Sequence, residues 1–307
     1  MPIKSLKIHR LKWINISSLS GEDVKYLEKN FRFHPLDLKD CLEGVQQPKL
    51  DIYRDYLFII FHFPIFDPEK QRISIQSLNV FLGTNYLITI TRDSDELLGD
   101  IFSKMRKTAK RVVRYDQLKN NSGYLLYKII DSRYHKSLPI INEMGRYLDE
   151  VEEEVYSNKN KEVTLNLAVI RRNIFNLRRI LEPQLKMVEK LVNIKNPAIA
   201  DKLPVYFDDV HDYLVNMWSA LENYRDTIDS LYNTNESFIN QKTNEVIKML
   251  TIISVALLPM TLIASIYGMN VEGLPFAEHP IGLWLIFLLM AGIVFGSIYF
   301  AKKNDII

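Results

Sequence analysis

The spacing of hydrophobic and polar positions in the first part of the chain alternates between strand-like and helix-like. Residues 4–16 and 53–66 have the alternating or continuous apolar pattern of strands, and residues 77–93 fit two strands joined by a Gly-Thr-Asn turn. Residues 20–31 begin with a serine and an acidic first turn, and residues 94–114 carry acids early and bases late, as the helix dipole prefers. The pattern predicts a mixed α/β domain.

Long helices are predicted after this domain. No glycine occurs between Gly145 and Gly268, and the polar pattern fits helices over about 123–157 and 162–195. A third helix begins near Pro204, because proline is well tolerated in the first turn. The sequence has no helix-ending signal between Pro204 and Gly268, so the predicted helix has about 64 residues and is roughly 95 Å long at 1.5 Å per residue.

Two apolar runs, residues 249–267 and 281–300, contain no charged residue. Each has about 19–20 residues, and roughly 29 Å of helix is enough to cross the hydrocarbon core of a bilayer. Helices in a soluble core seldom stay free of charge on all sides over this length. The two runs therefore predict two transmembrane helices.

The charges that flank these runs predict their orientation. Lys242 and Lys248 precede the first apolar run, and Lys302 and Lys303 follow the second. The loop between the two runs contains no Lys or Arg. Because basic flanks stay in the cytoplasm, both termini are predicted to be cytoplasmic and the loop to lie outside. We expect a multi-pass protein of the cell membrane.

The long third helix has two distinct faces. Apolar residues in alternating steps of four and three form a seam that should pack on other helices: Val210, Leu214, Met217, Leu221, Tyr224, Ile228 and Leu231. A polar stripe begins further on and continues into the apolar run: Asn233, Ser237, Asn240, Asn244, Ile247, Thr251, Ser254, Leu258, Thr261 and Ser265. The amides and hydroxyls of this stripe need partners or water. They could bond across a dry helix interface, but a water-filled path along the helix explains the whole stripe.

Composition adds little to this picture. The formal net charge of +2, with 25% charged and 47% hydrophobic residues, gives no indication of nucleic-acid binding. The single cysteine, Cys41, excludes an internal disulfide. The soluble part has no nucleophile–base set, phosphate loop or clustered metal ligands, so an enzyme is not expected. The histidines share no metal-ligand spacing and are interpreted as structural: His34, His62, His135 and His211.

Residues 243–270, with the short loop, second apolar run and basic tail that follow, resemble the CorA family of magnesium channels. Tyr267-Gly268-Met269-Asn270 matches the signature of that family, and its position between the two predicted spans makes the match specific. Residues 46–64 and 81–93 resemble the family's cytosolic α/β domain, and residues 204–217 resemble the start of its stalk helix. The resemblance covers nearly all 307 residues. It implies a CorA-like funnel built as a homopentamer, with the first spans lining a central pore.

The chemistry of the signature fits a magnesium filter. Mg²⁺ holds its waters tightly and demands near-octahedral geometry. A selective pore entrance can therefore bind the hydrated ion without removing its water molecules. The neutral oxygens of the Asn270 side chain and the Gly268 backbone, repeated around a ring with Met269 between them, can accept hydrogen bonds from those waters. Glu272 and Glu278 lie further along the loop, where charge can concentrate cations without trapping them. A tight interhelical turn alone would also explain Gly268 and Asn270.

The loop departs from the family pattern at one position. Leu274 and Pro275 fit, but Phe276 stands where the family has a glutamate. A zinc-transporting branch of the superfamily also has a variant loop. Mg²⁺ is the expected ion, with Co²⁺ or Ni²⁺ as further substrates and a zinc transporter as the alternative.

Gating candidates lie far from the loop, at the start of the long helix. Asp209 matches an aspartate that, by the resemblance, holds regulatory Mg²⁺ together with an acidic residue of the α/β domain of a neighbouring subunit. Asp95 and Asp100 are both candidates for that partner, and Asp212 adds charge nearby. Bound Mg²⁺ would screen carboxylates that otherwise repel each other, and so close the pore when cytosolic Mg²⁺ is ample. Stabilisation of a helix N-terminus is the simpler interpretation of these aspartates.

The predicted architecture is an α/β cytosolic domain followed by long stalk helices and two C-terminal transmembrane helices. Its segments are an α/β domain (1–120), a helical hairpin (121–203), a stalk continuing into the first span (204–267), the loop (268–280), the second span (281–301) and a basic cytosolic tail (302–307). The predicted function is uptake of divalent cations down the membrane potential, with Mg²⁺ as substrate and regulatory ligand and no organic cofactor. Expected partners are further copies of the chain and membrane lipid. A non-conducting membrane-tethered scaffold or sensor is the alternative from another class.

Overall fold

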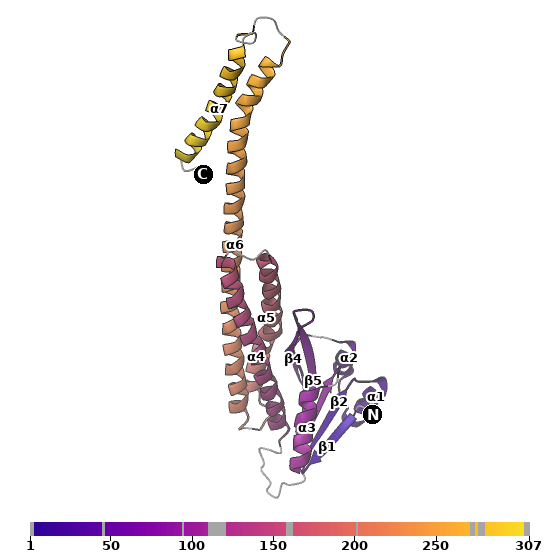
Figure 1. Cartoon of the computed structure of the whole chain (residues 1–307). Helices are drawn as coiled ribbons and strands as arrows, with labels where there is room; N and C mark the ends of the chain where they lie inside the picture. The colour runs from indigo at the N-terminus through magenta and orange to yellow at the C-terminus, as the bar shows by residue number, and fades with distance from the viewer. Residues whose placement is uncertain are drawn as a thin grey trace. The chain divides into compact units, whose positions relative to one another are not determined.

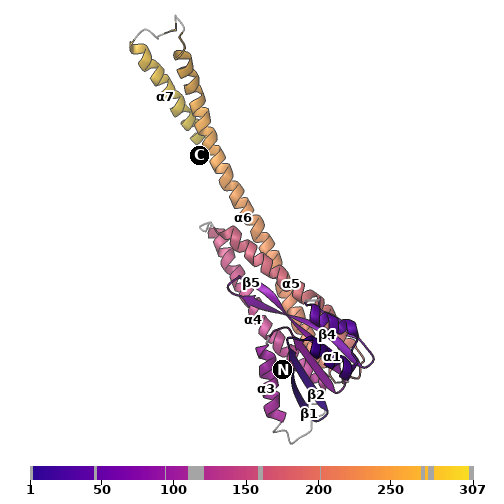
Figure 2. The same ribbon diagram turned by 90° about the vertical axis from the view of Figure 1, so that its right-hand side faces the viewer.

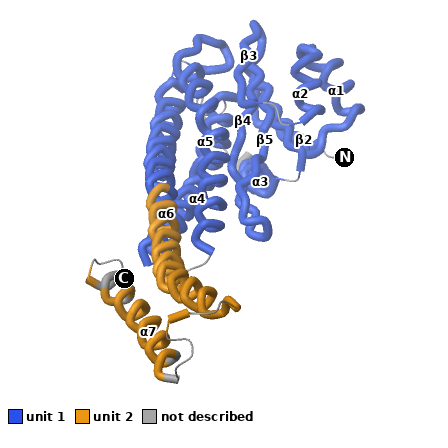
Figure 3. The backbone as a smooth tube through the Cα atoms, turned by 90° about the horizontal axis from the view of Figure 1, so that it is seen from above, with its two compact units in different colours: residues 1–232 blue, residues 233–307 orange. Residues whose placement is uncertain are grey.

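The computed structural model describes residues 3–44, 47–93, 95–109, 121–157, 162–200, 202–270, 274–275 and 280–303. The chain forms two compact units, residues 1–232 and 233–307 (Figure 3). The boundary lies inside one long helix and coincides with no boundary predicted from the sequence. The reason is that the first half of this helix packs into the soluble unit, whereas the sequence boundaries follow the ends of helices and apolar runs.

The first unit is built on a six-stranded sheet with the order β1-β2-β6-β5-β4-β3. Its strands are β1 (Ile3–Ile8), β2 (Leu11–Ser17), β3 (Lys49–Ile52), β4 (Tyr56–Asp67), β5 (Arg72–Gly83) and β6 (Tyr86–Thr91). Strands β2 and β6 are parallel, and all other neighbours are antiparallel. The single strand predicted over residues 4–16 is wrong: His9, with φ 50°, turns the chain into a β1–β2 hairpin. The alternation continues on both sides of this short turn, so periodicity alone did not reveal it.

Except for α2, the helices agree closely with the predicted helical runs, and residues 110–114 of the run predicted over 94–114 lie outside the described residues. They are α1 (Gly21–Phe31), α2 (Pro35–Glu43), α3 (Glu96–Ala109), α4 (Ser122–Ser157), α5 (Val163–Asn193), α6 (Pro204–Tyr267) and α7 (Pro280–Lys303). Ser20 caps α1 as predicted, in a capping box with Asp23. Helix α2 was not predicted; its signal was Pro35 in the first turn, with His34 accepting a bond from the Leu36 N–H.

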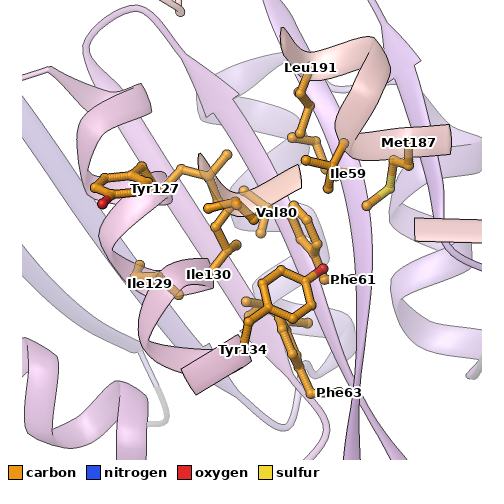
Figure 4. Close-up of a cluster of buried hydrophobic side chains, with 14 of the residues drawn as sticks. Ile59, Phe61, Phe63, Val80, Tyr127, Ile129, Ile130, Tyr134, Met187 and Leu191 are labelled. Carbon is orange, nitrogen blue, oxygen red and sulfur yellow. The ribbon is translucent and has the colours of Figure 1, made fainter. Parts of the chain in front are cut away.

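Both faces of the sheet are covered, which explains the continuous apolar run of β4. Leu57, Ile59 and Phe61 point into a core with α4, α5 and the first part of α6, whereas Phe58 and Ile60 pack toward α1 and α2. Figure 1 shows the two helical layers on opposite sides of the sheet, and Figure 4 shows side chains of α4 and α5 interlocking with those of β4 and β5. A strand buried on both faces keeps no polar alternation.

The seam predicted on α6 is confirmed within the first unit. Val210, Leu214, Met217, Leu221, Ile228 and Leu231 are all buried. The close fit extends to Tyr224, whose ring occupies the space that a Cβ on Gly145 of α4 would need. Two ion pairs flank the seam, Arg178–Glu222 at 2.6 Å and Arg171–Asp229 at 3.1 Å. Helix α6 is thus anchored to the soluble unit along its first half.

Candidate ion-conducting site

The Tyr267-Gly268-Met269-Asn270 signature lies where α6 ends, with Tyr267 as the last residue of the helix. The Gly268 N–H donates to the Ala264 carbonyl at 2.9 Å, and the Met269 N–H donates to the Ile266 carbonyl at 3.3 Å. A Cβ on Gly268 would lie 3.1 Å from the Ala264 oxygen, tighter than ordinary contact. Glycine is therefore favoured here by the close approach of backbone to backbone, and not by a left-handed conformation. Met269 and Asn270 are exposed in the single chain, while Glu272, Phe276 and Glu278 lie outside the described residues.

The predicted polar stripe is exposed along its whole length in the single chain. Asn233, Ser237, Asn240, Asn244, Ile247, Thr251, Ser254, Leu258, Thr261 and Ser265 all belong to the exposed class. The hydroxyls of Thr251, Ser254 and Thr261 donate to the carbonyl four residues earlier, at 2.8–2.9 Å. Their proton is used within the helix, which leaves the oxygen lone pairs free to accept from water or from another helix.

The opposite side of α6 is the side that α7 covers. Ala256 is only 8% exposed, and Ile252, Pro259 and Ile263 are half-buried. Within the second unit, α7 runs beside the last part of α6 (Figure 2). At about 100° per residue, Ala256 lies roughly 160° around the helix from Ser254. The stripe therefore lies on the side of α6 away from α7, within a wider exposed surface that also includes Val255, Leu257 and Leu262.

Among the described residues, the segment Pro204–Tyr267 contains a stretch long and apolar enough to cross a membrane, and only 6% of that stretch is buried. The apolar segment Trp284–Ser297 within α7 is shorter. A long apolar helix that stays uncovered differs from the core helix of a soluble protein. The prediction of two spans is thus matched by one clear candidate and one shorter apolar segment.

The aspartates predicted to regulate the protein lie on the exposed start of α6. Asp209 is exposed and close enough to α4 that its charge, after burial and the charge of Asp131, helps to raise the pKa of Tyr127. Its neighbours form a separate group, because Asp208, His211 and Asp212 each offer a ligand atom and these atoms lie within 4.8 Å of one another. The i, i+3, i+4 spacing is the sequence signal for this group, and the expectation that the soluble part has no clustered metal ligands overlooks it.

Asp95 and Asp100, the two candidate partners of Asp209, occupy different environments. Asp95 is buried, pairs with Arg133 of α4, and accepts a hydrogen bond from the Leu98 N–H at 3.1 Å at the start of α3. Arg133 also donates to Gln76 at 2.6 Å and stacks on Phe63. Asp100 is exposed, one turn further along α3. Only Asp100 therefore presents an accessible carboxylate.

A soluble α/β unit joined by one continuous helix to an apolar helical unit, with a polar stripe ending at an uncharged turn, is the arrangement of a membrane transport protein. Residues 9–303 match the family model described as CorA-like Mg2+ transporter protein. The chain belongs to this family, whose members are membrane transporters of divalent cations and not enzymes.

Individual relatives agree with the family match. The chain is 30% identical to the cobalt/magnesium transport protein CorA of Thermotoga maritima, over 95% of this chain and 82% of the relative. It is similar in structure to the complete CorA magnesium transporter of Methanocaldococcus jannaschii, with a TM-score of 0.81 and 24% identity over 99% of this chain and 94% of that one. Full-length CmaX also has this fold, with a TM-score of 0.73 and 21% identity over 95% of this chain and 88% of that one. The predicted fold class is confirmed.

Proposed function

We propose that this protein is a channel that takes up Mg²⁺, and also Co²⁺ or Ni²⁺, down the membrane potential. The observation that carries this proposal is the polar stripe of α6, which leads to the Gly268-Met269-Asn270 turn in a chain of the CorA-like family. A relative 30% identical to this chain is named for cobalt and magnesium transport. A scaffold that only tethers a soluble domain has no need of such a stripe.

The filter acts on the hydrated ion. Mg²⁺ dehydrates reluctantly, so the oxygens that select it should accept hydrogen bonds from its water shell. The Asn270 amide oxygen and the Gly268 carbonyl supply neutral acceptors, and a ring of such groups from several copies would surround the ion. Neutral acceptors hold the ion weakly enough to release it. Glu272 and Glu278 raise the local cation concentration outside the filter.

The pore is formed by several copies of the chain in the cell membrane, and we propose a homopentamer. One copy exposes the stripe and covers the opposite face of α6 with α7. An assembly with the stripes facing a common axis gives the amides and hydroxyls water, and it leaves α7 to face lipid. Both termini are cytoplasmic in this arrangement, as the basic flanks Lys242, Lys248, Lys302 and Lys303 suggest.

Cytosolic Mg²⁺ closes the channel at a site shared between subunits. Asp209 supplies one carboxylate, and Asp100 of a neighbouring copy is the better candidate for the other, because Asp95 is already paired with Arg133 in its own subunit. Asp212 adds negative charge on the same part of α6. Mg²⁺ binding would relieve the repulsion of these carboxylates and stabilise the closed state by mass action.

Ion uptake into proteoliposomes tests the proposal. Under an inside-negative potential, the wild type should take up Mg²⁺, with Co²⁺ and Ni²⁺ competing, whereas Asn270→Ala should assemble normally and take up none. Preferential uptake of Zn²⁺ would favour the zinc-transporter alternative. The absence of flux for all four ions in an assembled protein would favour the scaffold.

A further inference from the structure

The residue before the proposed filter is bonded to the far side of the loop. The hydroxyl of Tyr267 donates a hydrogen bond to the Pro275 carbonyl at 3.0 Å. The bond joins residues eight positions apart, and Gly268, Met269 and Asn270 lie in the segment that it closes. Tyr267 is the last residue of α6 and is half-buried.

Both ends of this bond are held in place by local structure. The donor belongs to a helix whose last turn is fixed by the bond from Gly268 N–H to the Ala264 carbonyl at 2.9 Å. The acceptor is the carbonyl of a proline, whose ring restricts φ, the backbone rotation that precedes this carbonyl. A hydrogen bond between two restricted groups loses little freedom when it forms. The end of α6 and the Leu274–Pro275 side of the loop are therefore held together as one structure.

We propose that Tyr267 is a positioning residue for the filter, holding the loop so that the Gly268 carbonyl and the Asn270 amide keep the orientation that a hydrated cation requires. This inference rests on the proposed filter. A hydrated ion is recognised through directional hydrogen bonds, whose strength falls steeply with misalignment. Loss of the Tyr267 hydroxyl should therefore weaken ion binding at the mouth without removing any group that contacts the ion.

A tyrosine at the end of an apolar helix has a simpler explanation, since aromatic residues favour the membrane interface. Tyr267→Phe keeps the ring and removes the hydroxyl, which is both the hydrogen-bond donor and the polar tip that favours the interface. The same change at a second tyrosine of the apolar unit therefore separates the two roles. Tyr299→Phe is the matched control, since Tyr299 lies in the last part of α7 and is 69% exposed. Neither substitution should change assembly.

The experiment measures Mg²⁺ uptake against external Mg²⁺ in proteoliposomes for the wild type, Tyr267→Phe, Tyr299→Phe and Asn270→Ala. For Tyr267→Phe we expect the half-saturating concentration to rise about 2- to 10-fold, the effect of one net hydrogen bond, and the Mg²⁺ to Co²⁺ uptake ratio to change. Tyr299→Phe should have the half-saturating concentration and the Mg²⁺ to Co²⁺ uptake ratio of the wild type. A second measurement follows the labelling of Leu274→Cys by an impermeant maleimide in a Cys41→Ser background. The rate should rise when Tyr267→Phe is added.

Each outcome decides one question. If Tyr267→Phe leaves half-saturation and the uptake ratio unchanged while Asn270→Ala abolishes uptake, the positioning role is wrong and the filter stands. If Asn270→Ala transports normally, the filter is wrong, and the labelling rate alone decides whether the bond holds the loop. Equal labelling with and without the Tyr267 hydroxyl would overturn the inference.

Discussion

The side-chain amide of Gln184 pairs with the backbone of His62 as a neighbouring strand would. The His62 N–H donates to Gln184 Oε1 at 3.0 Å, and Gln184 Nε2 donates to the His62 carbonyl at 2.8 Å. Strand β3 pairs with β4 only as far as Ile60, and no other described strand pairs with this edge of β4 beyond that point. Gln184 of α5, itself fully buried, completes the edge and fixes the helical layer against the sheet.

We predict that Gln184→Met lowers the free energy of unfolding of the soluble unit by about 2 kcal/mol or more. Methionine keeps the volume but leaves two backbone groups of His62 buried without partners, at about 1–3 kcal/mol for each. Thermal unfolding of the full chain in detergent measures the loss. The matched control is Glu182→Met, two residues away and exposed, which should leave the midpoint unchanged. An equal midpoint for both variants would show that the amide pairing contributes nothing.

A second prediction concerns Arg133, which neutralises the buried carboxylate of Asp95. Arg133→Met should destabilise the protein by about 3–5 kcal/mol, because it leaves an uncompensated charge in the interior. Asp95→Asn keeps an oxygen that can cap α3 and removes the charge. The double variant should therefore be more stable than Arg133→Met alone. Unfolding of the two single variants and the double variant measures the coupling, and additive losses would contradict it.

Cysteine accessibility tests the proposed pore face. In a Cys41→Ser background, cysteines at Asn244, Thr261 or Ser265 should react with small water-soluble thiol reagents and block transport. Cysteines at Ala256 and Ile263, on the face that α7 covers, should react slowly. Labelling at similar rates all around α6 would rule out a water-filled path along the stripe.

Cys41 should itself be inert in the folded protein. Burial, with the negative charges of Asp37 and Asp40, raises the pKa of the Cys41 thiol far above its ordinary value. The thiolate is the reactive form, so raising the pH from 7 to 9 should speed labelling of Asn244→Cys but leave Cys41 unreactive. A disulfide reagent added before and after denaturation measures this. Reaction of native Cys41 at the rate of the exposed cysteine would show that its site is open.

The last prediction concerns the regulatory carboxylates. Asp209→Ala removes one ligand from a site that stabilises the closed state, so the cytosolic Mg²⁺ concentration that halves the flux should rise about 5-fold or more, the scale of a typical coupling energy. Asp100→Ala should act in the same direction, and Asp209→Lys could replace the bound charge and favour closure. Ion flux measured at increasing internal Mg²⁺ concentrations, for each variant and the wild type, tests these expectations. Coincident curves for Asp209→Ala, Asp209→Lys and the wild type would reduce Asp209 to a residue that stabilises a helix terminus.

The sequence by itself determined the features that depend on local spacing. The seam from Val210 to Leu231 predicted which face of α6 is buried, because one helical period relates its members. Pro204 and Gly268 marked the ends of that helix, and the absence of charge in residues 249–267 predicted its apolar half. The Tyr-Gly-Met-Asn signature, read between two apolar runs, led to the family. All of these are properties of neighbouring residues.

Only the tertiary structure decided which distant groups meet. The sequence left Asp95 and Asp100 equivalent. The pairing of Asp95 with Arg133, which belongs to helix α4, distinguishes them. The bonds of Gln184 to His62 and of Tyr267 to Pro275 join residues whose spacing carries no periodic signal. Such contacts depend on how helices pack on a sheet and on the conformation of the loop after α6. The local conformational preferences of the residues determine neither of these.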